Sequence, residues 1–156
     1  MDIDLPGVGC GFDDLPLGGF FMARRSEPVF GMCVTDGHTK SAIVFSSEKH
    51  GRPVSLAVGG LPNDLIVSFP RAVMRGDLSS IADNQSVPGA IISAAGEFYM
   101  RAYLNLGDYY TFNVRSGALE RPPAHARALV FAGWRVGFLT DGKFDPIFTF
   151  PFQPRN

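Results

Sequence analysis

Short apolar runs, separated by turn-forming residues, follow one another along most of this chain. The first four lie at Val29–Val34, Thr39–Ser46, Pro53–Val58 and Leu65–Phe69. In Phe98–Leu104, apolar residues alternate strictly with Tyr and Arg, the period of two that is typical of a half-buried strand. The same signals predict further strands at Ala90–Ala94, Tyr109–Arg115, Leu129–Leu139 and a last strand that carries Phe148, Phe150 and Phe152.

The turns between these runs indicate antiparallel pairing. Asp36-Gly37 and Asp141-Gly142 are dipeptides that favour tight hairpins. Pro146 and Pro151 place the last strand at a sheet edge, because proline cannot donate to a ladder. We therefore expect a mainly-β, single-domain antiparallel β-sandwich or barrel over residues 28–156. We expect at most one short helix, at Arg71–Arg75.

Residues 1–27 do not follow the strand pattern. Five glycines and two prolines interrupt every period in this segment, yet it is too apolar for a disordered tail. We therefore expect an extended N-terminal arm that packs on its own domain or on a neighbouring subunit.

Charge and composition narrow the function classes. The net charge of −1 makes nucleic acid an improbable partner, because such binders are usually strongly basic. The four aspartates before Arg24 give the first 23 residues a charge of −4, which leaves +3 for the remainder. The start of the chain lacks the features of a signal peptide, and no apolar run reaches the roughly 20 residues of a membrane span. We expect a protein of the cytoplasm or of a virion, with no membrane partner.

The sequence contains few of the residue patterns that catalytic chemistry requires. Gly7-Val8-Gly9-Cys10-Gly11 lacks the preceding strand and the third glycine of a dinucleotide-binding loop. Cys10 is the one candidate nucleophile, with His38, His50 or His125 as a distant base. The cysteines and histidines show no metal-ligand spacing. We expect no cofactor, no metal and no enzymatic activity.

Two sets of residues are candidates for contact with a partner. Tyr99, Arg101 and Tyr103 share one strand face, where they would stack on nucleobases or on a partner's rings, or would lie half covered by the arm or a loop. The second set consists of large apolar side chains from the arm and the last strand, expected at a subunit interface: Leu5, Phe12, Leu15, Leu17, Phe20, Phe21, Phe148, Phe150 and Phe152.

The leading hypothesis is a non-enzymatic structural or assembly protein that acts through protein–protein contacts. A phage capsid decoration or tail protein, bound to itself or to another structural protein, is one example. The alternative is a β-barrel that binds a small ligand or a peptide in an aromatic cavity. The third hypothesis is a Cys-dependent enzyme built on Cys10.

Overall fold

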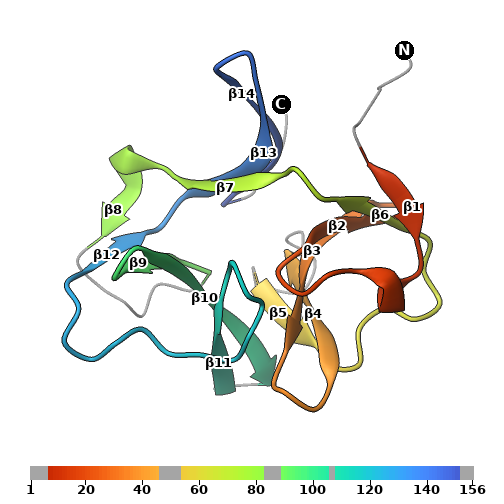
Figure 1. Ribbon diagram of the computed structural model, residues 1–156, viewed down its shortest axis with the longest axis horizontal. Coiled ribbons are helices and arrows are strands. Elements are labelled where there is room, and N and C mark those ends of the chain that lie inside the picture. The colour runs from red at the N-terminus through yellow and green to blue at the C-terminus, as the bar shows by residue number, and fades with distance from the viewer. Residues whose placement is uncertain (1–6, 46–53, 83–88, 106–107, 152–156) are drawn as a thin grey trace.

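The computed structural model describes residues 7–45, 54–82, 89–105 and 108–151, and these fold into two β-sheets (Figure 1). The mainly-β sandwich expected from the sequence is confirmed. The strands of the larger sheet are β1 (Val8–Cys10), β2 (Phe20–Ala23), β3 (Val29–Thr35), β4 (Lys40–Phe45), β5 (Val54–Ala57), β6 (Ile66–Phe69), β8 (Ile81–Ala82), β9 (Ile91–Ala94), β10 (Glu97–Asn105), β11 (Asp108–Asn113) and β12 (Ala128–Phe131). The smaller sheet contains β7 (Val73–Gly76), β13 (Trp134–Thr140) and β14 (Lys143–Phe150). The described helices are two 3₁₀ turns, η1 (Phe12–Asp14) and η3 (Leu78–Ser80).

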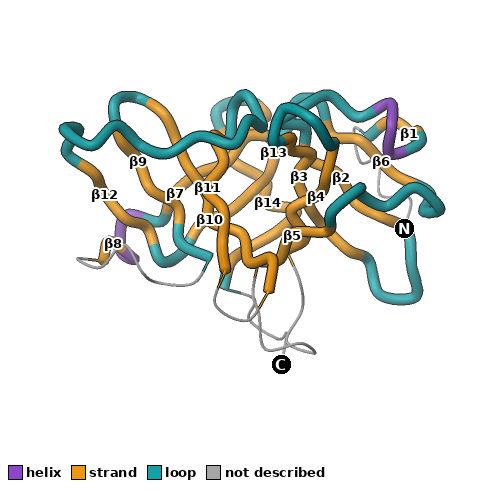
Figure 2. The backbone as a smooth tube through the Cα atoms, turned by 90° about the horizontal axis from the view of Figure 1, so that it is seen from below, coloured by secondary structure: helices purple, strands orange, loops and turns teal. Residues whose placement is uncertain are grey.

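The larger sheet runs in the order β1-β6-β2-β3-β4-β5-β10-β9-β12-β8, with β11 also paired to β10. Figure 2 shows β9 and β12 at one end of the molecule and β1 and β6 at the other, with β13 and β14 between them. The main core lies between the two sheets. It takes side chains from β2–β5, from β9–β11 and from the smaller sheet.

An aromatic cluster from both sheets forms the centre of this core. Trp134 is fully buried, stacks on Phe150 with 5.0 Å between ring centroids, and meets Phe45 edge-to-face at the same distance. Its indole N–H donates to the carbonyl oxygen of Gly89 at 2.8 Å, so its polar group is satisfied in the core. Phe148 packs against both Phe45 and Trp134. These contacts join the two sheets.

The hairpins agree with the sequence prediction. Asp36-Gly37 lies in the turn between β3 and β4, and Asp141-Gly142 joins β13 to β14 in a two-residue loop. Asp141 and Gly142 both have positive φ, the conformation that matches the twist of such hairpins. β14 is an edge strand of the smaller sheet, as Pro146 within it and Pro151 directly after it predicted.

Two elements differ from the prediction. The stretch expected as one strand over Leu129–Leu139 is divided between β12 in the larger sheet and β13 in the smaller one. Gly133 lies at the break, where its N–H donates to the Ser80 hydroxyl and its carbonyl accepts from Asp77 N–H, so it leaves both ladders. The helix expected at Arg71–Arg75 is replaced by strand β7, because the tertiary pairing of β7 with β13 overrides the local helix signals.

The N-terminal segment requires the largest correction, because its described residues are not an arm. β2 pairs with β3 on one side and β6 on the other, and β1 pairs with β6. Phe20 faces the main core, whereas Phe21 faces a second core on the opposite side of the sheet together with Phe12. Both faces of β2 are therefore covered, which explains why its apolar residues do not alternate with polar ones.

Within the described ranges, no helix has the length and apolar character needed to cross a membrane.

Candidate binding groove

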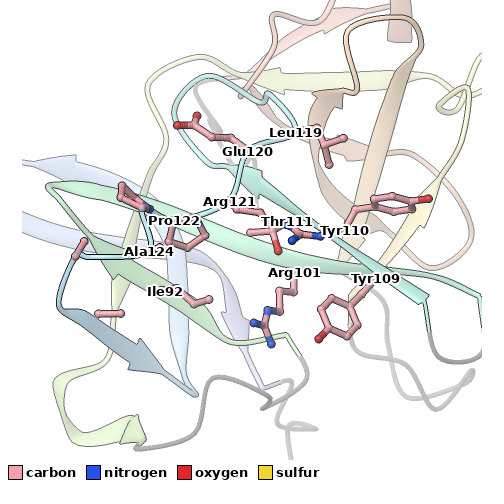
Figure 3. Close-up of a pocket in the computed structure, with 13 residues that line it drawn as sticks. Ile92, Arg101, Tyr109, Tyr110, Thr111, Leu119, Glu120, Arg121, Pro122 and Ala124 are labelled. Atoms are coloured by element: carbon pink, nitrogen blue, oxygen red, sulfur yellow. The ribbon is translucent and has the colours of Figure 1, made fainter.

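A hollow of about 700 Å³ lies on the face of β9, β10 and β11 that points away from the main core (Figure 3). We call it the outer groove. Its floor comes from these three strands and its wall from the segment that leads to β12. The lining residues are Ile92, Arg101, Tyr109, Tyr110, Thr111, Leu119, Glu120, Arg121, Pro122, Pro123, Ala124, Ala126 and Ala128.

Strand register explains which side chains reach the groove. Met100 and Phe112 form a cross-strand pair in the main core, so their neighbours Arg101 and Thr111, also paired, face the opposite way. The alternation seen in the sequence thus identified the correct face for Arg101.

The guanidinium group of Arg101 lies over an aromatic ring at the edge of the groove. Its central carbon is 4.9 Å from the centroid of the Tyr109 ring, within the range of a cation–π contact. The Tyr109 ring in turn meets Tyr103 edge-to-face, with 6.1 Å between centroids. Tyr109 is about half exposed, so this stack presents an aromatic surface to solvent beside the half-buried Arg101.

The wall contributes a second arginine. Arg121 and Thr111 both line the hollow, and Figure 3 shows the Glu120 carboxylate on the far side of the groove from Arg101. Two guanidinium groups, one carboxylate and a threonine hydroxyl thus line the same hollow. Among the described lining residues, two side chains are basic and one is acidic, and Tyr109, Tyr110 and Pro123 are exposed.

Backbone hydrogen bonds hold the start of the wall. The Glu120 N–H donates to the Thr111 carbonyl at 3.0 Å, and the Leu119 N–H donates to the Thr35 carbonyl at 2.9 Å. Residues 117–120 are therefore fixed between β11 and the end of β3. Pro122-Pro123 cannot continue this pairing, because proline has no N–H, and the chain turns away from β11 there. The wall is a fixed part of the domain where it meets β11.

The residues predicted for the strand-face stripe separate into two roles. Arg101 and Tyr103 are half-buried at the edge of the groove, in agreement with the half-covered face that was one of the two expectations. Tyr99 is only 2% exposed and packs in a third core cluster with Ile92 and Val130, so it does not belong to a surface stripe. Burial raises the pKa of the Tyr99 hydroxyl, with Glu120 and Glu97 acting in the same direction.

The set expected at a subunit interface lies mostly inside this domain. Phe148 and Phe150 belong to the main core, because β14 is covered on its apolar side. The rings of β2 and η1 belong to one core or the other. Leu17 is 46% exposed, and Leu5 and Phe152 lie outside the described residues. The buried members are Phe12, Leu15, Phe20, Phe21, Phe148 and Phe150.

The candidate nucleophile has an unfavourable environment. Burial, and to a lesser extent Asp14, raise the pKa of the Cys10 thiol, and these effects outweigh Lys40 and a hydrogen bond from the Ser68 backbone. Cys33 is fully buried, and burial raises its pKa too. Within the described ranges, no group of three or more His, Cys, Asp or Glu side chains is placed to hold a metal ion.

Cys10 should therefore alkylate slowly. A raised pKa leaves less thiolate at a given pH, so the reaction with iodoacetamide at pH 7.5 should be slower than that of glutathione and should still accelerate above pH 9. Peptide mapping by mass spectrometry distinguishes Cys10 from Cys33. Alkylation of Cys10 faster than glutathione would contradict this environment and support a Cys-dependent enzyme.

Comparison with protein-family models, with curated proteins and with solved structures found no match. Sequence reasoning identified Arg101 and Tyr103 but did not include Thr111, Glu120 or Arg121 in the site. The only local signal for the wall was Pro122-Pro123, which excluded a continuous helix but did not indicate what the segment covers.

Proposed function

We propose that this chain is a non-enzymatic binding protein that acts through protein–protein contacts, and that the outer groove receives an extended segment of its partner. The observation that carries this proposal is the stack of Arg101 on Tyr109 at the edge of a hollow of about 700 Å³. Tyr and Arg are the residue types enriched where protein interfaces have most of their binding energy. A stacked guanidinium also loses little conformational freedom on binding.

The groove, rather than the N-terminal segment, supplies the contact in this proposal. The aromatic side chains of residues 7–23 stabilise their own domain and are not free to cross onto a neighbour. An assembly role in a virion, as a capsid decoration or tail component, is one setting in which such a groove would operate. The partner in that setting is a second copy or another structural protein.

A small ligand is the second candidate, because the volume of the groove lies within the roughly 300–1,000 Å³ typical of such sites. Small-molecule sites usually enclose most of their ligand, however. Here much of the lining, including Tyr109, Tyr110, Arg121 and Ala124, is exposed. An exposed groove of this size suits an extended peptide better.

Filling the groove should abolish partner binding. Ala124 is an exposed lining residue, so Ala124→Trp adds a large ring to the hollow without disturbing a core. Peptides selected on the wild-type protein from a random seven-residue displayed library should bind this variant at least tenfold more weakly. Ser26→Trp, at an exposed turn outside the groove lining, is the matched control and should bind like the wild type.

The outcome that contradicts the proposal is equally concrete. Either no peptide is enriched on the wild-type protein, or the selected peptides bind Ala124→Trp as tightly as they bind Ser26→Trp. Size-exclusion chromatography with light scattering on the wild type and Ala124→Trp then tells whether the partner is a second copy of this chain.

A further inference from the structure

We infer that the partner segment is acidic and carries an apolar side chain next to its acidic residues, an inference that rests on the proposed function. It follows from a second hollow beside the outer groove. This apolar pocket of about 160 Å³ is lined by Asp36, Ser41, Leu56, Val58, Leu104, Tyr110, Phe112 and Leu119.

The two hollows are adjacent. Tyr110 and Leu119 line both of them, and these side chains are 41% and 43% exposed. Figure 3 shows both on the side of the groove away from Ile92 and Ala124. A chain lying in the outer groove therefore passes directly over these two side chains to reach the apolar pocket.

The chemistry of the two hollows is different. Among its described lining residues, the outer groove has two arginines, Arg101 and Arg121, and one carboxylate, that of Glu120. The charge complementary to this surface is negative, and guanidinium groups pair with carboxylates through two parallel hydrogen bonds.

The apolar pocket supplies a site for one aliphatic or aromatic side chain. Val58 is 62% exposed at its edge, and Leu56, Leu104 and Phe112 line it. Its acidic lining residue, Asp36, already accepts two backbone hydrogen bonds, from His38 at 2.8 Å and Thr39 at 2.7 Å. The turn between β3 and β4 thus holds this carboxylate in place, and an apolar side chain gains by covering the exposed aliphatic surface.

A matched set of short peptides tests the inference by isothermal titration calorimetry. The probes are acetyl-Gly-Leu-Asp-Asp-Asp-Gly-amide, the same peptide with lysine for each aspartate, and the same peptide with alanine for leucine. We expect the first to bind with a dissociation constant below about 1 mM, and the other two at least tenfold more weakly. Raising the salt concentration should weaken binding of the acidic peptide, because salt screens the attraction between exposed charges.

Variants assign the effect to the two hollows. Arg121→Gln should weaken binding of the acidic peptide about tenfold. Arg127→Gln makes the same change of charge at an exposed residue outside the groove lining, and its affinity for the peptide should stay within about twofold of the wild type. Val58→Ser, at an exposed position, should remove most of the difference between the leucine and alanine peptides. This charge-matched comparison separates a specific contact from a change in net charge.

The inference is overturned if the lysine peptide binds as well as the acidic one, if Arg127→Gln weakens binding as much as Arg121→Gln, or if no probe binds at about 1 mM. None of these results contradicts the proposed function, which is judged by the library selection and the Ala124→Trp variant. Failure of that selection contradicts the groove itself, whatever the charge of the ligand.

Discussion

Replacement of Trp134 by alanine should lower the free energy of unfolding by about 3–5 kcal/mol, a large part of the stability of a domain this size. The indole is fully buried and contacts Phe45, Phe148 and Phe150, so the truncation leaves a cavity between the two sheets. It also leaves the Gly89 carbonyl without its donor. Urea denaturation followed by circular dichroism measures the change without relying on the single tryptophan.

Trp134→Phe is the matched control. It retains a six-membered ring in the cluster but loses the hydrogen bond to Gly89, and should cost about 1–3 kcal/mol. A loss of less than about 1 kcal/mol for Trp134→Ala would mean that the indole does not join the two sheets as described.

The second large effect is expected in the N-terminal segment. Phe21→Ala should also lower the free energy of unfolding by about 3–5 kcal/mol, because Phe21 is 1% exposed and packs edge-to-face on Phe12 with 6.0 Å between centroids. Leu17→Ala, at a side chain that is 46% exposed, should change the stability by less than about 0.5 kcal/mol.

This pair of variants distinguishes a folded segment from an arm. If residues 7–23 belong to the domain, Phe21→Ala destabilises the monomer at every protein concentration. If they were an arm that contacts a neighbour, the effect would depend on protein concentration and disappear on dilution.

The features that sequence predicted well are those set by local chemistry. Asp-Gly at residues 36–37 and 141–142 specifies tight turns through the conformations available to those residues, independently of the rest of the chain. The alternation in Phe98–Leu104 likewise gave the correct faces of β10. The prolines of the last strand excluded a central position.

The features that sequence missed depend on long-range packing. β2 is covered on both faces, so its Phe20-Phe21 pair shows no alternation, and the glycines and prolines before it resembled an irregular arm. β12 and β13 are continuous in hydrophobic pattern but enter different sheets at Gly133, whose bonds to Ser80 and Asp77 connect residues far apart in sequence.

The residues of the candidate site also divide into those that a local pattern predicts and those that depend on long-range packing. Arg101 was found because its face follows from strand alternation. Arg121 was missed because its position depends on the hydrogen bonds that fix residues 117–120 between Thr35 and Thr111, which no local pattern encodes. Six of the residues predicted for a subunit interface are instead buried within this domain: Phe12, Leu15, Phe20, Phe21, Phe148 and Phe150. Large aromatic residues are common both in cores and in interfaces, so their number in a sequence does not distinguish the two.

The central claim is that the outer groove is the binding surface of this protein. It is tested by a ¹⁵N-HSQC titration of the assigned protein with a peptide selected on the wild-type protein from the displayed library. We expect the perturbed backbone amides to gather at Arg101, Tyr109, Thr111 and residues 119–124, with few changes on β7, β13 and β14. Perturbations centred on those three strands, or absent from the groove at saturation, would contradict it.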